Sequence, residues 1–215
     1  MKLLPPVACF LAAVISGGHS LVCDTCTNSN GDSCTGPPGT CDAAQDRCIA
    51  TLTETVTPKG KTQSFARACG KAKDCGRLSS LSNDQVKVSS SSKCCSSDRC
   101  SPDKVSVPRR ETQENGQVCQ ACYAPSAEEC AGQNTVRCTG VENQCIKFGM
   151  PVQMGGELPY AMRGCANIAM CESKGKLSFP GITAELKKFE CNRGSHLQHS
   201  LPMLVGFLLL FKLLS

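Results

Sequence analysis

The middle of this 215-residue chain carries the pattern of apolar and polar positions that β-strands show. Residues 49–56 are rich in β-branched side chains and partly alternate between apolar and polar, a turn sequence follows at 58–61, and Phe65 lies on the return. This arrangement predicts a long β-hairpin. Because no segment shows a sustained apolar period of 3.6 residues, the pattern predicts an all-β protein with little helix.

A second hairpin is predicted further along the chain, with strands over 146–152 and 160–165 around a glycine turn at 155–156. Short strands are predicted at 86–88 and 186–189, and each of them comes shortly before a cysteine. The two sets of strands follow the same order, which indicates that one structural unit occurs twice.

Two apolar segments lie at the ends of the chain. The first covers residues 3–15 after a single lysine, and small residues follow it. This order is typical of a secretory signal peptide, here residues 1–20, with cleavage between Ser20 and Leu21. A membrane anchor is the competing interpretation, but it needs about 20 apolar residues and conflicts with the prolines at 5–6.

The second apolar segment covers residues 201–215, and the polar residues 193–200 separate it from a group of small residues. This order is typical of a glycosylphosphatidylinositol (GPI) attachment signal, here 193–215, with Asn192 as the predicted attachment residue. The alternatives are an uncleaved tail and a spanning helix, which would be short and interrupted by Lys212. We therefore expect an extracellular protein held at the cell surface by a GPI anchor, with a secreted, soluble protein as the alternative.

Cysteine is the dominant feature of the composition. The chain has 19 cysteines against no tryptophan, two tyrosines and seven phenylalanines, so it lacks the aromatic side chains for one large core. Such a composition is typical of a disulfide scaffold or of a metal site. Cys9 belongs to the predicted signal peptide, and the 18 cysteines that remain are an even number, as complete pairing requires.

Histidine is scarce, and its positions argue against several chemistries. His19, His196 and His199 lie near the chain ends, with no histidine between residues 20 and 195. A serine or cysteine nucleophile usually needs a histidine base, and mixed zinc sites need histidine ligands. We therefore expect no catalytic residue, no metal ion and no cofactor, although an all-cysteine zinc site and a lysine-based mechanism stay open.

The cysteines form an internal repeat. The first series is Cys23, Cys26, Cys34, Cys41, Cys48, Cys69, Cys75 and Cys94, and the second is Cys119, Cys122, Cys130, Cys138, Cys145, Cys165, Cys171 and Cys191. Each member of the second series lies 96 or 97 residues after its counterpart, which predicts two copies of one module, at 21–100 and 118–192. The first copy has two further cysteines, Cys95 and Cys100, so we expect five bridges there and four in the second copy. Spacing alone does not select among the pairings.

Residues 101–117 separate the two modules. They include two prolines and almost no apolar side chains, so we expect an exposed linker. Within this segment, Arg109–Arg110 is either a processing site for a furin-like protease or an ordinary solvated charge pair.

The cysteine spacing resembles that of the three-finger family of lymphocyte antigens and the urokinase receptor (Ly6/uPAR). The matching features are a C-x2-C-x7-C-x6-C-x6-C start, a long hairpin, two cysteines six residues apart, and the closing Cys-Cys-x4-Cys of the first copy. The resemblance covers both modules and implies two small disulfide-rich domains in tandem, each with β-hairpin fingers that project from a palm. One position departs from the family, because Ser101 stands where an asparagine usually follows the closing Cys100.

The family resemblance also implies a disulfide pairing. In the first module it joins Cys23 with Cys48, Cys26 with Cys34, Cys41 with Cys69, Cys75 with Cys94, and Cys95 with Cys100. In the second module it joins Cys119 with Cys145, Cys122 with Cys130, Cys138 with Cys165, and Cys171 with Cys191.

A complete first module followed by a second one without the last bridge is similar to the gamma-type phospholipase A2 inhibitors and the sodefrin-precursor-like proteins. Two segments are similar in both, Asn115-Gly116-x-x-Cys119 and Arg163-Gly164-Cys165. The resemblance implies a non-enzymatic extracellular protein whose partner is a secreted phospholipase A2. The alternatives are a GPI-anchored receptor or adhesion protein like the urokinase receptor, and a secreted signalling protein of the pheromone type.

Charge adds one candidate surface. The chain has a net charge of +5, and six basic residues gather between residues 59 and 77. Among them, Lys59, Lys61, Lys71 and Lys73 are the predicted contacts for an acidic partner or lipid headgroups, with a solvated finger as the competing interpretation. Because no aromatic residues are interleaved with these lysines, we expect no nucleic acid partner. The oligomeric state is left open.

Overall fold

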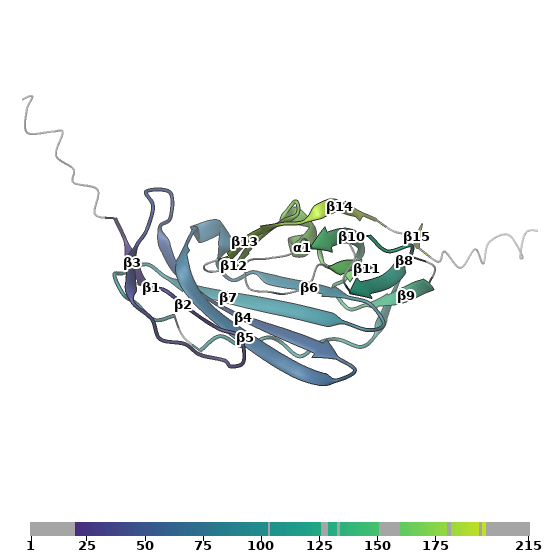
Figure 1. Cartoon of the computed structure of the whole chain (residues 1–215), viewed down its shortest axis with the longest axis horizontal. Helices are drawn as coiled ribbons and strands as arrows, with labels where there is room; N and C mark the ends of the chain where they lie inside the picture. The colour runs from purple at the N-terminus through teal and green to yellow at the C-terminus, as the bar shows by residue number, and fades with distance from the viewer. Residues whose placement is uncertain are drawn as a thin grey trace, which may run out of the picture.

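The computed structural model describes residues 20–102, 104–125, 129–132, 134–150, 160–179, 182–193 and 195–196 (Figure 1). Nearly all of the regular structure in them is β-strand, with one five-residue helix, α1 (Ile168–Glu172), and one 3-10 turn, η1 (Ala72–Asp74). The all-β class predicted from the sequence pattern is confirmed. The signal peptide before Ser20, the 155–156 turn and the segment beyond residue 196 lie outside the described residues.

Module one is built on a long central hairpin. Its strands are β1 (Val22–Asp24), β2 (Cys26–Asn28), β3 (Pro38–Thr40), β4 (Arg47–Thr57), β5 (Gly60–Gly70), β6 (Leu78–Ser82) and β7 (Lys87–Cys95). Strands β4 and β5 pair antiparallel over their full length, from Arg47 opposite Gly70 to Thr57 opposite Gly60. Gly60 takes a φ of +133°, which an L side chain rarely adopts, so glycine suits this turn. The predicted first hairpin is therefore confirmed.

Module two is also built around an antiparallel hairpin. Its strands are β8 (Glu114–Pro125), β9 (Asn134–Thr139), β10 (Gln144–Met150), β11 (Tyr160–Ala166), β12 (Lys176–Phe179), β13 (Ile182–Glu185), β14 (Lys187–Asn192) and β15 (Ser195–His196). Strands β10 and β11 form the second predicted hairpin, and β14 adds to the other side of β10. Strands β12 and β13 pair with each other in a separate two-stranded sheet.

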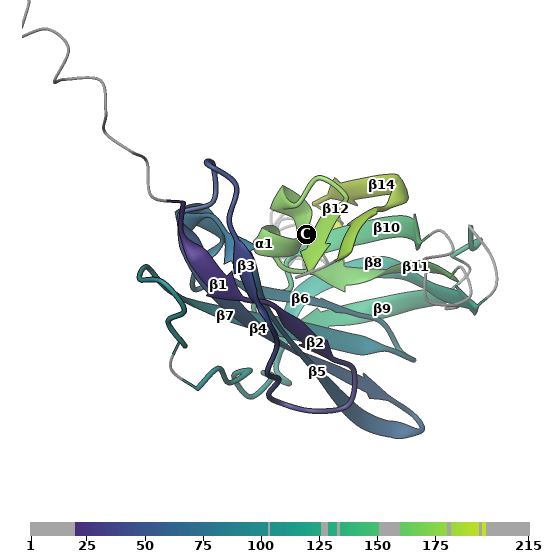
Figure 2. The same cartoon turned by 60° about the vertical axis from the view of Figure 1, so that its left-hand side comes forward.

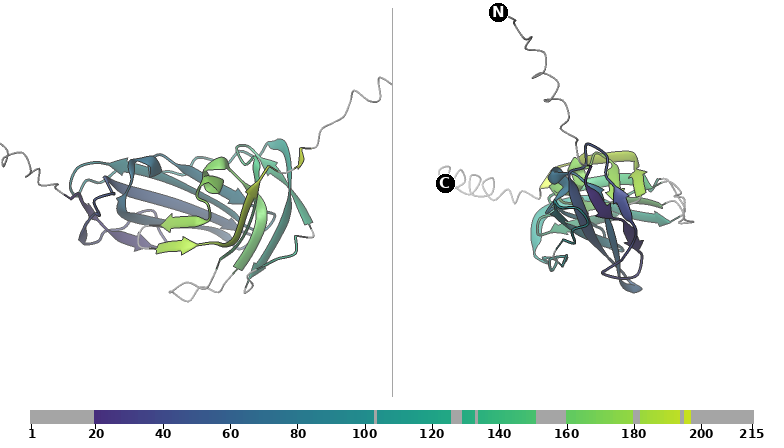
Figure 3. Two further views of the ribbon diagram at one scale, coloured as in Figure 1. Left: turned by 90° about the horizontal axis from the view of Figure 1, so that it is seen from above. Right: turned by 90° about the vertical axis from the view of Figure 1, so that its left-hand side faces the viewer.

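The two modules share one continuous sheet, in the order β14-β10-β11-β6-β7-β4-β5-β2 (Figures 1 and 2). The junction is the pairing of β11 with β6, where Cys165 lies opposite Ser82 and Ala166 opposite Leu81. Gly164 makes this approach feasible, because a Cβ there would lie 2.1 Å from the carbonyl oxygen of Ser82. Figure 3 shows the strands of module one, in purple and blue, beside those of module two, in teal and green.

Side chains reinforce the junction. The amide of Asn167 donates to the carbonyl of Leu78 at 2.6 Å and accepts from the amide nitrogen of Ser80 at 3.1 Å. Leu81 of module one belongs to the main apolar cluster of module two, beside Met162 and other buried residues. The two modules therefore share one apolar core and are joined by more than the linker.

A buried carboxylate also ties the linker to both modules. Glu142 is 2% exposed, and it accepts a hydrogen bond of 2.5 Å from the hydroxyl of Ser82. Its other oxygen pairs with the guanidinium of Arg110, also at 2.5 Å. Arg110 therefore has a defined ionic partner, Glu142. Use of Arg109–Arg110 as a protease processing site stays a hypothesis.

The expectation of an exposed linker is wrong for part of residues 101–117. Val105 is 5% exposed and packs in the cluster that contains Ala50, Leu52 and Phe65, with Val107 against its edge. Strands β4 and β5 bear these apolar side chains on one face. Val105 and Val107 of the linker pack on that face and remove it from water. Two isolated apolar residues in a polar segment were too weak a pattern to predict this packing.

Candidate functional site

Nine disulfides among the described residues hold the palms of the two modules. They join Cys23–Cys48, Cys26–Cys34, Cys41–Cys69, Cys75–Cys94, Cys95–Cys100, Cys119–Cys145, Cys122–Cys130, Cys138–Cys165 and Cys171–Cys191. These are the pairs that the family resemblance implies. Each bridge closes a short loop and removes conformations from the unfolded chain, which stabilises domains of this size by several kcal/mol in total.

Neighbouring bridges pack against each other at the same place in each module. Sγ of Cys23 lies 3.3 Å from Sγ of Cys41, and Sγ of Cys119 lies 3.4 Å from Sγ of Cys138. Together with Cys69 and Cys165 they bring three sulfurs within 4.8 Å in each module. Because every one of these sulfurs belongs to a disulfide, none is the thiolate that a metal ion would need. The two clusters are therefore the apolar centres of the palms.

The structure divides the four predicted contact lysines into two pairs. Lys59 and Lys61 lie at the tip of the β4–β5 hairpin, whereas Lys71 and Lys73 lie beyond its base, and all four are exposed. Ten residues of extended chain separate Lys61 from Lys71, about 33 Å at the rise of a β-strand. Lys61 also pairs with Glu54 at 2.5 Å. The four lysines therefore cannot form one compact contact surface.

Other predicted positions lie at the margins of the modules. Leu21 packs against the first disulfide cluster, and its carbonyl accepts from the amide nitrogen of Cys41 at 2.7 Å, while Ser20 is exposed. Asn192 ends β14 and is exposed. In the described part of the chain, no helix has the length and apolar character of a membrane span.

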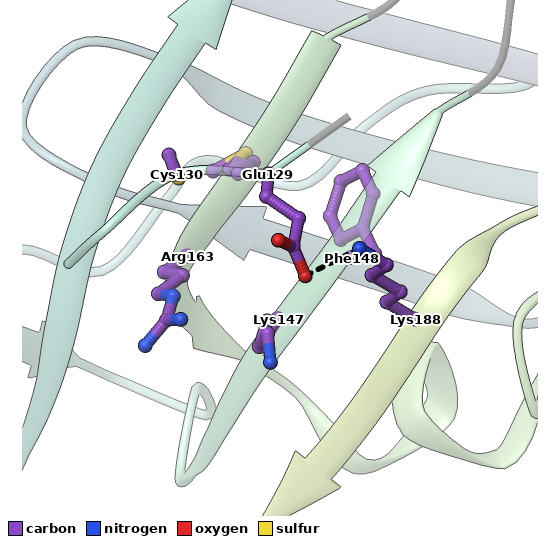
Figure 4. A pocket seen from close by; sticks show the side chains of 7 residues that line it. Glu129, Cys130, Lys147, Phe148, Arg163 and Lys188 are labelled. Atoms are coloured by element: carbon purple, nitrogen blue, oxygen red, sulfur yellow. Dashed lines mark ion pairs between the residues drawn. The ribbon is translucent and has the colours of Figure 1, made fainter. Parts of the chain in front are cut away.

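A charged hollow on module two was not predicted from the sequence (Figure 4). Its floor is a row of directly opposed residues, with Arg163 of β11 beside Lys147 of β10 and Lys147 beside Glu190 of β14. Above this row the carboxylate of Glu129 pairs with the ammonium of Lys188 at 2.6 Å. Apart from Lys188 and Glu190, which both lie on β14, these residues are far apart in the sequence and share no local motif, so the strand pairing brings them together.

A disulfide and a glycine place Glu129 over the row. Cys122 lies opposite Arg163 in the pairing of β8 with β11, and it is bonded to Cys130, the residue after Glu129. Gly132 then passes close to the guanidinium, because a Cβ there would lie 2.8 Å from Cδ of Arg163. The loop is thus held against the sheet at both sides of the arginine.

The electrostatics of the hollow are dominated by cations. The hydrogen bond and the charge of Lys188 lower the pKa of Glu129 below its ordinary value, with smaller contributions from Lys147 and Arg163. Lys147 in addition pairs with Glu190 at 3.1 Å, and Arg163 donates to the side-chain oxygen of Gln120 at 2.6 Å. Nε of Arg163 is buried and has no hydrogen-bond partner among the described residues.

The hollow is shallow. It measures about 170 Å³ and adjoins a second one of about 320 Å³, both volumes including open solvent, and Lys147 and Arg163 line both. Sites that enclose a small molecule are typically deeper and mostly apolar. Charged side chains line both hollows, beside buried apolar ones such as Phe148 and Met162 in the first. The site is therefore suited to contact with a macromolecule, through ion pairs and hydrogen bonds.

Comparison with known proteins assigns each module. Residues 21–102 match the family of phospholipase A2 inhibitor domains, and residues 115–198 match the u-PAR/Ly-6 domain. The phospholipase A2 inhibitor NAI of Notechis ater is 27% identical over 172 residues, which cover 76% of this chain and 82% of that protein. A gamma-type phospholipase A2 inhibitor of Laticauda semifasciata is 28% identical over 160 residues, 70% of this chain and 84% of that protein.

Among solved structures, mouse TEX101 aligns with 81% of this chain and 99% of its own, at 16% identity and a TM-score of 0.35. The two domain matches together cover most of the chain, and they follow in the order that the cysteine repeat predicts. The chain therefore carries a phospholipase A2 inhibitor domain and a u-PAR/Ly-6 domain in tandem, which is the arrangement of the two-module Ly-6/u-PAR family.

Proposed function

We propose that this protein is a non-enzymatic extracellular protein that binds a secreted phospholipase A2 and blocks its access to lipid. The observation that carries the proposal is the match of both modules, in order, to relatives named as phospholipase A2 inhibitors over more than four fifths of those relatives' length. The identity of 27–28% supports the type of partner and leaves the particular enzyme to experiment.

The joined modules also support a macromolecular partner. The shared sheet and the Asn167 and Glu142 contacts fix one module against the other, so their surfaces present a single preformed shape. A preformed surface loses less conformational entropy on binding than two mobile domains would. The hollow on module two lies on this combined surface and presents charged groups to a partner.

The test uses the full-length chain expressed in animal cells and purified in oxidised form. Hydrolysis by several secreted phospholipases A2 is measured on mixed phospholipid vesicles at increasing lipid concentration. Inhibition by binding the enzyme depends on the ratio of protein to enzyme, whereas coating of the substrate is overcome by more lipid. Reduced and alkylated protein is the control. No inhibition of any enzyme at micromolar protein, together with no capture of enzyme on immobilised protein, would contradict the proposal.

A second candidate is a GPI-anchored receptor or adhesion protein. The apolar segment at 201–215 after the polar residues 193–200 favours it, with Asn192 as the attachment residue. Phosphatidylinositol-specific phospholipase C should then release the protein from expressing cells, and Asn192→Gln should abolish surface display. Protein that is found only in the medium, without prior lipase treatment, would contradict the anchor and favour a soluble protein. The two candidates are compatible, because an inhibitor can be tethered.

A further inference from the structure

The charges around Glu129 are arranged as in a binding site that is already filled. Lys147, Arg163 and Lys188 come from three different strands and line one hollow with Glu129, whose carboxylate pairs with Lys188. Figure 4 shows the ion pair between Glu129 and Lys188, with the side chains of Lys147 and Arg163 nearby in the same hollow. We propose that this hollow binds an acidic side chain of a protein partner, and that Glu129 occupies the site in the free protein.

Glu129, which occupies the hollow in the free protein, indicates the chemistry of the partner group that would replace it. Glu129 is a carboxylate carried on a peptide segment, so the hollow accommodates a carboxylate that arrives from a protein backbone. The three cations face two carboxylates, those of Glu129 and Glu190, which leaves one positive charge in excess. An incoming carboxylate is therefore attracted even before Glu129 leaves.

Exchange of the two carboxylates needs only a side-chain movement. The side chains of Glu129 and Lys188 are 57% and 50% exposed, so a partner reaches the ammonium from solvent. Exposed ion pairs of this kind contribute little to stability, and breaking one costs correspondingly little. The Cys122–Cys130 bridge ties Cys130, the residue after Glu129, to β8.

The surroundings favour a polypeptide over a lipid surface. The adjoining hollow is lined by Gln120, Asn192 and Glu190, whose side chains offer donors and acceptors to a peptide backbone. A membrane surface would instead favour cations grouped around exposed apolar side chains. The residues that are both exposed and large and apolar, Val56, Val141 and Ile168 in the described part of the chain, do not line either hollow.

The experiment measures binding of a fluorescein-labelled hexaglutamate peptide to the full-length protein by fluorescence anisotropy at low ionic strength. Glu129→Gln removes the internal competitor and keeps the shape, so it should tighten binding by about twofold to fivefold, the range for one exposed ion pair. Lys147→Gln with Lys188→Gln should weaken binding at least fivefold. Salt should weaken binding to the native protein because the contacts are ionic.

Matched variants separate the site from general charge. Glu185→Gln removes an exposed carboxylate of module two that lines neither hollow. Lys174→Gln with Lys176→Gln removes two exposed cations that also line neither hollow. We expect little change from either. The proposal is overturned if Glu129→Gln tightens peptide binding no more than Glu185→Gln does. It is also overturned if the Lys147/Lys188 and Lys174/Lys176 double variants weaken peptide binding equally.

Two further arms fix the class of the ligand. Vesicles of phosphatidylcholine with phosphatidylserine, and inorganic phosphate, replace the peptide in parallel titrations. Tighter binding of either one, with the same dependence on Glu129 and Lys147, would overturn the assignment to a protein partner. If the double lysine variant does not fold, the gain expected for Glu129→Gln still decides the matter. None of these measurements uses a phospholipase, so the site and the proposed function fail independently.

Discussion

The side-chain amide of Asn167 donates to the carbonyl of Leu78 at 2.6 Å, across 89 residues of sequence and from one module to the other. The oxygen of the same amide accepts from the amide nitrogen of Met170, at 3.0 Å, as the N-cap of α1. One residue thus begins the helix of module two and fixes β6 of module one.

Asn167→Ala should destabilise the whole protein. It removes the helix cap and leaves the carbonyl of Leu78 and the N–H of Ser80 without their side-chain partner, for a combined loss of about 2 kcal/mol. Urea unfolding of the oxidised protein measures the change, and Asn143→Ala, at an exposed turn, is the control. A loss equal to that of the control would show that the strand pairing alone holds the junction.

Glu142→Gln should open the linker to proteolysis. The substitution removes the charge that pairs with Arg110 but keeps a group that bonds to Ser82. Arg110 is partly exposed, so the expected loss of stability is modest, about 1–2 kcal/mol, below that of a fully buried pair. Trypsin should then cut after Arg110 several times faster, as followed by mass spectrometry. Glu185→Gln, at an exposed position outside the linker, should leave the rate unchanged, and equal rates in both variants would contradict the protective role of the pair.

Val105→Ala should reveal that the linker is part of the core of module one. Two methyl groups are removed from a buried site against Leu52 and Phe65, which costs about 1–2 kcal/mol. Thermal unfolding measures this loss. Val141→Ala, at a position 56% exposed, is the matched control and should cost almost nothing. An unchanged melting temperature for Val105→Ala would mean that the linker packs only loosely.

The titration of Glu129 should depend on Lys188. The ammonium of Lys188 lowers the pKa of this carboxyl below its ordinary 4.5. A lowered pKa in the folded state means that the ion pair stabilises the protein above the ordinary value, and that this contribution is lost as the pH falls through the lowered one. Carbon-detected NMR should show Glu129 titrating below the ordinary 4.5, and Lys188→Gln should raise its pKa. If Lys188→Gln leaves the titration unchanged, the ion pair does not form in solution.

Sequence patterning was sufficient where the determinants are local. The Thr-rich alternation before the turn at 58–61 sets β4 and β5, because strand pairing across a short turn depends on neighbouring residues. The cysteine repeat predicted two modules because eight spacings agree at once. Local pattern did not show how the basic stretch is laid out, because Lys61 and Lys71 are close in sequence but lie near opposite ends of β5. Their contact with an acidic partner stays a prediction.

The sequence by itself therefore determined the all-β class, the two disulfide modules and their order, all of which follow from local pattern and repeat. The tertiary structure alone decided the β6–β11 junction, the burial of Val105 and the basic hollow around Glu129. Each of these joins residues far apart along the chain, such as Leu81 with Ala166 or Glu129 with Lys188. Contacts of this kind depend on which sheet edges meet, and no local pattern of side chains encodes that choice.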